Sequence, residues 1–237
     1  MPVYQLLQDS YGFPSTWEAE PDGLLAIGGD LSPGRLLAAY SMGIFPWYSD
    51  HEPILWWSPA PRLVLFPEEL HISKSMRPLF NQKTFTVTID TAFHRVIQAC
   101  RSIYRKDQLG TWITSEMVKA YSLLHQLGFA HSIEVWKEKE LVGGLYGIGL
   151  GSCFFGESMF AKESNASKFG FIWAVRAMEK LGFEVIDCQT RTNHLVSLGA
   201  REIERGEFEK LLDRALQNDH LRGSWTHFPE FQATPRL

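Results

Sequence analysis

Cysteine is scarce in this 237-residue chain, and its three copies lie far apart. An odd count at wide spacing argues against a disulfide framework and fits a reducing compartment. Cys100, Cys153 and Cys188 also lack the close pairing that zinc sites require. We therefore predict neither a structural disulfide nor a metal site.

Excess positive charge and long apolar runs are absent too. The net charge is −4, so no overall basic field attracts nucleic acid, and only a local basic patch would bind it. No apolar run is long enough to span a membrane. Residues 1–5 lack the charged and apolar regions of a signal peptide. We therefore predict a cytoplasmic protein without membrane contact.

Aromatic residues are plentiful, with 16 Phe, 8 Trp and 7 Tyr. Residues 1–65 are rich in Pro, Gly and Trp, which predicts a small aromatic-rich N-terminal domain held by aromatic packing rather than by regular sheets. One helix is expected there, from Ser32 and Pro33 at its start to Gly43 at its end. The aromatics either wall a pocket or fill an irregular core, and composition does not separate the two interpretations.

The pattern of residues 66–237 predicts a larger domain of strands and helices. Alternating apolar residues predict strands at 63–66, 84–90, 131–136, 141–148, 152–160 and 183–187. Helical periodicity predicts helices at 73–77, 92–104, 115–127 and 165–181. An antiparallel meander, then a helix, then a parallel strand is the order of GNAT-type N-acyltransferases. The predicted fold class is α+β, a small N-terminal domain plus a GNAT-type N-acyltransferase-like domain with a mixed sheet.

The strand that ends in Asp187 and Gln189 is the most informative segment. Residues two apart share a face of a strand, so we predict that both side chains face a substrate while Cys188 faces the core. The crossover brings Glu157 to the same sheet edge, where open α/β sheets bind ligands. The pattern predicts an acidic cleft beside an apolar pocket. The alternative is a buried strand whose polar end caps the next turn.

Seven short motifs follow one another along nearly the whole chain: GGDLSP at 28–33, GIFPW at 43–47, WWSP at 56–59, GTWIT at 110–114, HSIEVW at 131–136, GESMF at 156–160 and DCQ at 187–189. Together they closely resemble the leucyl/phenylalanyl-tRNA–protein transferase family. The resemblance implies transfer of Leu or Phe, and less well Met, from aminoacyl-tRNA to acceptor proteins with an N-terminal Arg or Lys, which marks them for N-degron degradation. It implies no cofactor, since an aminoacyl ester is already activated. We also predict a monomer.

The catalytic candidates are Asp187, Gln189 and Glu157. An α-amino group has a reference pKa of ~7.7–8.0, so a carboxylate within hydrogen-bond range can orient it and take its proton. Asp187 and Gln189 are the candidates for base or orienter and for positioning the amine, and Glu157 for holding the ammonium or the ester end. The sequence leaves open which of the three is the base.

The resemblance also implies substrate-binding residues. Phe154, Gly156 and Ile186 are predicted walls of the Leu/Phe pocket, with Ser158 beside them. Trp47 and Trp112 are predicted stacking surfaces for the terminal adenosine of the tRNA.

Two basic clusters are weaker candidates for contacts to tRNA phosphates. One contains Lys74, Arg77 and Lys83, and the other contains Arg101 and Arg105. Phosphate contacts carry no sequence information, which suits an enzyme that accepts several tRNAs. The alternative for each of these residues is a solvated helix face.

The chain departs from the family pattern near the predicted cleft, and three rival functions are weighed against its residues. Arg191 stands near the predicted cleft, where its charge would repel a cationic acceptor. A CoA-dependent acetyltransferase needs a Gly-rich turn, but residues 160–165 contain no glycine. A thiol enzyme would use Cys188 with His194, without an evident third group. A non-catalytic RNA-binding protein would have no use for the acid pair.

Overall fold

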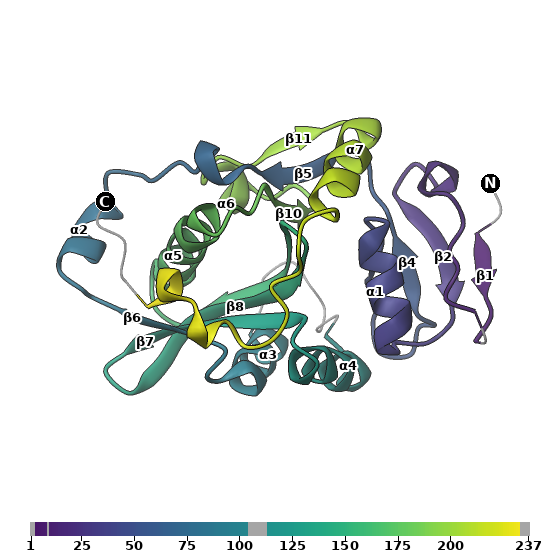
Figure 1. Cartoon of the computed structure of the whole chain (residues 1–237). Helices are drawn as coiled ribbons and strands as arrows, with labels where there is room; N and C mark the ends of the chain where they lie inside the picture. The colour runs from purple at the N-terminus through teal and green to yellow at the C-terminus, as the bar shows by residue number, and fades with distance from the viewer. Residues whose placement is uncertain (1–2, 9, 104–112, 233–237) are drawn as a thin grey trace.

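The computed structural model describes residues 3–8, 10–103 and 113–232, which form two sheets (Figure 1). The smaller sheet has the strand order β1-β2-β4-β3, and the larger one has the order β11-β5-β10-β9-β8-β7-β6. In Figure 1 the smaller sheet lies at one end of the molecule, and α1 (Pro33–Ser41) lies between it and the larger sheet.

The N-terminal region is more regular than predicted. Its strands are β1 (Tyr4–Leu6), β2 (Leu24–Gly28), β3 (Phe45–Pro46) and β4 (Leu55–Trp57). The expectation of aromatic packing without regular sheets is therefore wrong. Strands this short are too brief for alternating polarity to show in the sequence. The predicted helix is present as α1, and the Ser32 side chain caps it by accepting the Arg35 backbone N–H.

The larger sheet has the predicted order at its centre. An antiparallel meander consists of β7 (Ala130–Lys137), β8 (Glu140–Leu150) and β9 (Cys153–Ala161). Helix α5 (Ala166–Lys180) then crosses to β10 (Val185–Gln189), which pairs with β9 in parallel. Meander, helix and parallel strand confirm the predicted α+β class with a mixed sheet.

Three further strands extend this centre on both sides. They are β6 (Thr86–Ile89) beside β7, and β5 (Arg62–Leu65) and β11 (Arg201–Ile203) beyond β10. Strand β5 lies just before the predicted domain boundary at residues 65 and 66, yet it pairs with strands of the larger sheet. The boundary itself stays a prediction.

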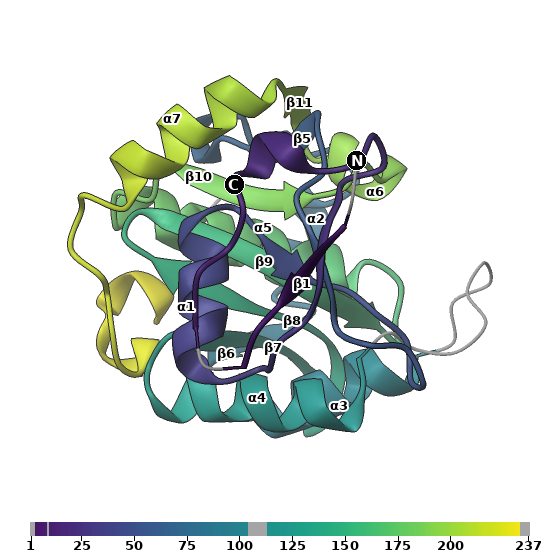
Figure 2. The ribbon, with the colours of Figure 1, turned by 90° about the vertical axis from the view of Figure 1, so that its right-hand side faces the viewer.

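Helices cover both faces of the larger sheet. Helix α5 packs on one face, while α3 (Phe93–Ser102) and α4 (Ser115–Gln126) cover the other (Figures 1 and 2). The remaining helices are α2 (Arg77–Asn81), α6 (Asn193–Val196), α7 (Arg205–Ala215) and the short 3₁₀ turns η1 (Thr16–Glu18), η2 (Pro67–Glu69), η3 (Trp225–His227) and η4 (Pro229–Phe231). Across the described residues, no helix combines the length and apolar character needed to cross a membrane.

The helix predicted at 73–77 begins later than expected. Helix α2 starts at Arg77, and Pro78 lies in its first turn. The first turn suits proline because its N–H would have no partner there.

One apolar core joins the two sheets. Leu25 of β2, Tyr40 of α1 and Phe155 of β9 belong to the same buried cluster. The Tyr40 and Phe155 rings meet edge to face at 5.2 Å. This contact sets α1 against the point where β9 and β10 begin to separate.

Candidate active site

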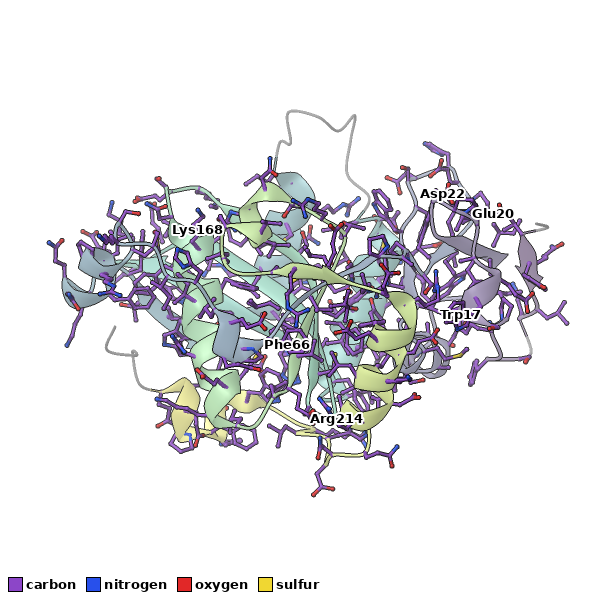
Figure 3. The ribbon with its side chains drawn as sticks, turned by 90° about the horizontal axis from the view of Figure 1, so that it is seen from above. Trp17, Glu20, Asp22, Phe66, Lys168 and Arg214 are labelled. Atoms are coloured by element: carbon purple, nitrogen blue, oxygen red, sulfur yellow. The ribbon has the colours of Figure 1, made fainter. Side chains whose placement is uncertain are left out.

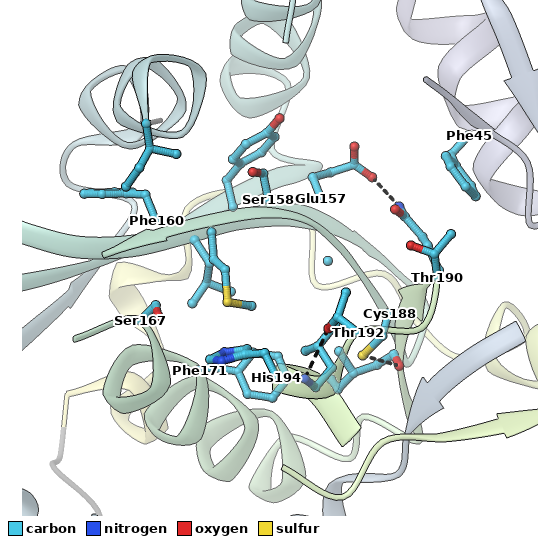
Figure 4. A pocket seen from close by; sticks show the side chains of 18 of the residues that line it. Phe45, Glu157, Ser158, Phe160, Ser167, Phe171, Cys188, Thr190, Thr192 and His194 are labelled. Atoms are coloured by element: carbon cyan, nitrogen blue, oxygen red, sulfur yellow. Dashed lines mark hydrogen bonds between the residues drawn. The ribbon is translucent and has the colours of Figure 1, made fainter. Parts of the chain in front are cut away.

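A cavity of about 510 Å³ opens where two parallel strands separate. Strands β9 and β10 pair over Cys153–Phe155 and Val185–Asp187, and the residues that follow on each strand line the cavity. Figure 4 shows these side chains facing a common space. The gap between the strands follows from two irregularities, one on each strand.

Both irregularities are β-bulges. On β9, Gly156 pairs with Gly147 while Ser158 pairs with Tyr146, so Glu157 is the extra residue. On β10, Asp187 pairs with Val64 while Gln189 pairs with Leu63, so Cys188 is the extra residue. A bulge bends its strand and redirects side chains, and bulges are over-represented next to active sites.

Glu157 is a buried carboxylate held by hydroxyl and amide donors. The Tyr40 hydroxyl donates to Glu157 Oε1 at 2.7 Å, and Gln189 Nε2 donates to the same oxygen at 2.9 Å. The Tyr121 hydroxyl lies 2.5 Å from that of Tyr40. Burial raises the pKa of Glu157 to about 7, because desolvation outweighs the hydrogen bonds that favour the anion. Glu157 therefore changes its charge near neutral pH.

Gln189 presents an amide oxygen to the cavity. Its Nε2 donates to Glu157, and within the described residues its Oε1 has no hydrogen-bond partner. The backbone of Gln189 has a φ of 62°, in the left-handed region that residues with a side chain rarely adopt. Its backbone N–H donates to Asp187 Oδ1 at 2.9 Å.

Asp187 is oriented differently from the prediction. It is 0% exposed, and its oxygens accept from Arg62 Nε and Nη2 at 2.8 and 2.7 Å. Ile186 and Cys188 line the cavity, whereas Asp187 does not. The expectation that Asp187 faces the substrate and Cys188 the core is therefore wrong. Side chains along β10 do alternate, but Ile186 and Cys188 face the cavity and Asp187 faces away from it. The bulge at Cys188 then brings Gln189 to the cavity as well.

Comparison with known proteins decides the family. The model of the Leucyl/phenylalanyl-tRNA protein transferase matches residues 64–213, and that of its N-terminal domain matches residues 29–60. A relative from Syntrophus aciditrophicus, named "Leucyl/phenylalanyl-tRNA--protein transferase", is 57% identical over 92% of this chain and 91% of its own. One of the same name from Desulfatibacillum aliphaticivorans is 55% identical over 95% and 97%. This chain belongs to the leucyl/phenylalanyl-tRNA protein transferase family.

Family membership confirms the predicted resemblance and the prediction of an aminoacyltransferase. Structural likeness is more remote. An aminoglycoside acetyltransferase from an uncultured soil metagenomic sample matches 48% of this chain and 84% of its own, at 10% identity and a TM-score of 0.38.

Most of the substrate-binding residues predicted for a leucyl/phenylalanyl-tRNA protein transferase do meet at the cavity. Its lining includes Trp47, Gly156, Ser158 and Ile186. Phe154 does not line it, and its prediction as a wall is wrong. The Phe154 side chain is 1% exposed and packs against Trp225 at 6.0 Å between centroids. Gly147 makes room for it, because a Cβ there would lie 2.5 Å from the Phe154 ring.

The other predicted positions lie outside the cavity or outside the described residues. Lys74, Arg77 and Lys83 are exposed around α2, far from the smaller sheet in Figure 1. Arg101 lies two residues before Ile103, which does line the cavity. Trp112 and Arg105 lie outside the described residues. Contacts of these residues with tRNA stay predictions.

Arg191, which the sequence placed near the cleft, forms an ion pair on the surface. Its Nη1 pairs with Glu202 Oε2 at 3.0 Å, and both side chains are exposed. Arg191 is also absent from the cavity lining. The carboxylate of Glu202, on β11, therefore balances the Arg191 charge at the surface.

The rival thiol function finds little support. Cys188 and His194 both line the cavity, but burial raises the pKa of the Cys188 thiol. A reactive thiolate needs the opposite shift. Within the described residues, no group of His, Cys, Asp and Glu has the arrangement of a metal site.

Tyr40, Tyr121 and Arg62 belong to the site without having been predicted. Tyr40 contacts Tyr121 and Glu157, and Arg62 contacts Asp187, all of them far away in the sequence. In the sequence, Tyr40 and Tyr121 occupy positions typical of the apolar face of an amphipathic helix. Sequence periodicity does not distinguish a buried tyrosine that packs from one that also donates a hydrogen bond to a carboxylate.

Proposed function

We propose that this chain transfers Leu or Phe from aminoacyl-tRNA to the terminal amino group of acceptor proteins. The observation that carries the proposal is an apolar cavity beside two polar groups. One is the amide oxygen Gln189 Oε1, which has no hydrogen-bond partner among the described residues, and the other is the buried carboxylate of Glu157, with a pKa of about 7. Family membership supports the same reaction.

The cavity offers a different surface to each part of the aminoacyl end. Trp47 lines it and remains 40% exposed, which suits stacking on the terminal adenosine. Apolar side chains suit the Leu or Phe side chain: Leu145, Met159, Phe171, Ile186 and Leu195. Figure 4 shows Phe45 on one side of Glu157 and Phe160, Ser167 and Phe171 on the other. We place the ester between these surfaces, next to Glu157 and Gln189.

In this arrangement the acceptor amine attacks the ester carbonyl carbon. Gln189 Oε1 accepts one N–H of the amine and orients its lone pair, and Glu157 takes the proton that the nitrogen loses. The C–N bond forms, the bond from carbon to the ribose oxygen breaks, and the proton ends on that oxygen. We assign the proton to Glu157 instead of Asp187 because Glu157 lines the cavity and Asp187 does not.

The proposal extends to acceptors that begin with Arg or Lys and to weaker use of Met. A carboxylate at the cavity attracts a cationic acceptor, and the ion pair with Glu202 keeps Arg191 from opposing it. We further propose that Lys74, Arg77, Lys83, Arg101 and Arg105 contact tRNA phosphates. Marking for N-degron degradation, cytoplasmic location, a monomeric state and the domain boundary stay predictions.

Transfer of labelled Phe from Phe-tRNA to a peptide that begins with Arg tests the function directly. We expect Trp47→Ala to raise KM for Phe-tRNA by roughly 10- to 100-fold, because stacking contributes ~1–3 kcal/mol per base. The control is Trp17→Ala, since Trp17 is 64% exposed, lies in the N-terminal part (Figure 3) and is not among the residues that line the cavity. No transfer by the unmodified chain would refute the function, and equal effects of both changes would refute the stacking role.

Gly156→Ala tests whether the cavity holds the aminoacyl group. Among the described residues, a Cβ at Gly156 would have one neighbour within 4 Å beyond the adjacent residues, the Asp187 carbonyl oxygen at 3.6 Å, so the methyl group fits the fold and intrudes on the cavity. We expect kcat/KM for Phe-tRNA to fall by roughly tenfold, more than for Leu-tRNA, with little change in melting temperature. Gly206→Ala on α7 is the matched control, because its Cβ would meet Trp17 at 3.7 Å. Unchanged kinetics for both tRNAs would place the aminoacyl group elsewhere.

A further inference from the structure

Arg62 is a buried cation that no sequence motif singles out. It lies on β5, is 1% exposed, and makes two hydrogen bonds to the Asp187 carboxylate. Neither Arg62 nor Asp187 lines the cavity. Any influence of this ion pair on transfer therefore passes through another residue.

Gln189 is the residue that connects the pair to the cavity. Asp187 Oδ1 accepts from Arg62 Nε and also from the Gln189 backbone N–H. The left-handed backbone of Gln189 is strained by ~1–3 kcal/mol, and such strain persists only where the surroundings hold it. Arg62 thus holds Asp187, and Asp187 holds the bulged end of β10 that aims Gln189 at Glu157.

Two aromatic rings fix the guanidinium itself. The Arg62 Cζ atom lies 4.9 Å from the centroid of the Phe45 ring and 4.8 Å from that of Phe208. Such contacts attract a cation to the faces of both rings. Phe45 belongs to the smaller sheet and also lines the cavity, whereas Phe208 belongs to α7. Arg62 is therefore clamped between a cavity wall and a helix on its other side.

Stability alone is a weak reason for such a pair. Burying both charges is costly, and within the described part of the chain Arg62 Nη1 has no hydrogen-bond partner. Apolar residues of similar volume often replace buried ion pairs without loss of stability. What apolar residues cannot supply is an acceptor for the Gln189 backbone N–H.

We infer that Arg62 is a positioning residue for aminoacyl transfer. It fixes Asp187, and through Asp187 it fixes the bulge at Gln189, so that Gln189 Oε1 meets the attacking amine. Arg62 itself touches no substrate. The inference rests on the proposed function and adds a residue that acts from outside the cavity.

Arg62→Lys in the full chain tests this role, with Arg35→Lys as the matched control. Arg35 is 0% exposed, pairs with Asp30 at 3.2 Å, and also has an Nη1 atom without a partner among the described residues. With Phe-tRNA and an Arg-initiated peptide, we expect kcat to fall about 100-fold in Arg62→Lys, because small misplacements of reacting groups are costly. KM for Phe-tRNA should stay within roughly twofold, as for a group that acts on the chemical step. Arg35→Lys should keep its kcat.

Two further measurements separate positioning from folding. Hydrogen exchange of the Gln189 amide should accelerate in Arg62→Lys and not in Arg35→Lys, while the amides of Val64 and Leu65 stay protected. The double variant Arg62→Met/Asp187→Leu should keep a melting temperature near that of the unmodified chain without regaining kcat.

A kcat like that of the unmodified chain in either Arg62 variant, or unchanged exchange at Gln189, would overturn the inference. Absence of transfer by the unmodified chain would instead refute the proposed function, and the exchange measurement would still test the positioning of Gln189.

Discussion

Glu157→Gln is expected to lower kcat by roughly 10²- to 10⁴-fold and to make the protein more stable at pH 8. The rate falls because the amide takes no proton from the attacking amine. Glutamine keeps an oxygen that accepts from Tyr40 and Gln189, so the packing is retained. Activity at pH 8 with the Arg-initiated peptide, measured beside the melting temperature, checks both effects.

The sign of the stability change follows from the pKa of Glu157. Its value in the folded protein is about 7, above the ordinary value of 4.5. At pH values between these two, the folded protein binds a proton that the unfolded chain has lost, so stability falls as the pH rises through this window. Above pH 7 the full cost of the buried anion is present, on the order of 3 kcal/mol. Glu157→Gln should remove this cost at pH 8 and change little below pH 4.5.

The pH dependence of the rate provides a second check. In the unmodified chain kcat/KM should rise with pH through about 7, as Glu157 loses its proton. That rise should be missing in Glu157→Gln, where the remaining pH dependence reports the acceptor amine. Glu163→Gln is the control, since Glu163 pairs with Lys137 on the surface. A Glu157→Gln variant as active as the unmodified chain at pH 8 would exclude Glu157 as the proton acceptor.

The centre of the larger sheet was predictable because each element carries its own signal. Strands β7, β8 and β9 and helix α5 were all expected from local polarity and turn residues. The chain order then determined the parallel pairing of β9 with β10, because such crossovers take one hand. The smaller sheet was not predictable in this way, since its strands of two to five residues depend on partners far along the chain.

The residues that meet at the cavity were predicted in part, and the orientation of Asp187 was missed. The sequence brings Glu157 and Gln189 together, and the structure joins them by a 2.9 Å hydrogen bond. Alternation predicted that Asp187 shares the face of Gln189, and a one-residue bulge breaks that rule. The partner that turns Asp187 away is Arg62, 125 residues earlier in the chain. No local pattern predicts such a pairing, because only the packing of β5 against β10 brings the two residues together.

Asp187→Asn is expected to destabilise the protein by roughly 3–5 kcal/mol, in contrast to Glu157→Gln. The change leaves the Arg62 guanidinium buried without a counter-charge, since both side chains are at most 1% exposed. Denaturant unfolding at pH 8 measures the effect. Glu202→Gln is the control, because the exposed ion pair with Arg191 is worth at most ~1 kcal/mol.

The two buried carboxylates, Glu157 and Asp187, thus have different roles in one site. Glu157 faces the cavity and is held by neutral donors, so its charge is costly to the fold and useful to the reaction. Asp187 faces a cation, so its charge offsets that of Arg62 in the fold, and its carboxylate holds the Gln189 backbone N–H at the edge of the cavity. Activity per folded molecule of Asp187→Asn, measured well below its melting temperature, should therefore fall about 100-fold, as expected for a misplaced amide. If that activity equals the unmodified chain's while stability falls, Asp187 serves the fold alone, and Gln189 keeps its position without it.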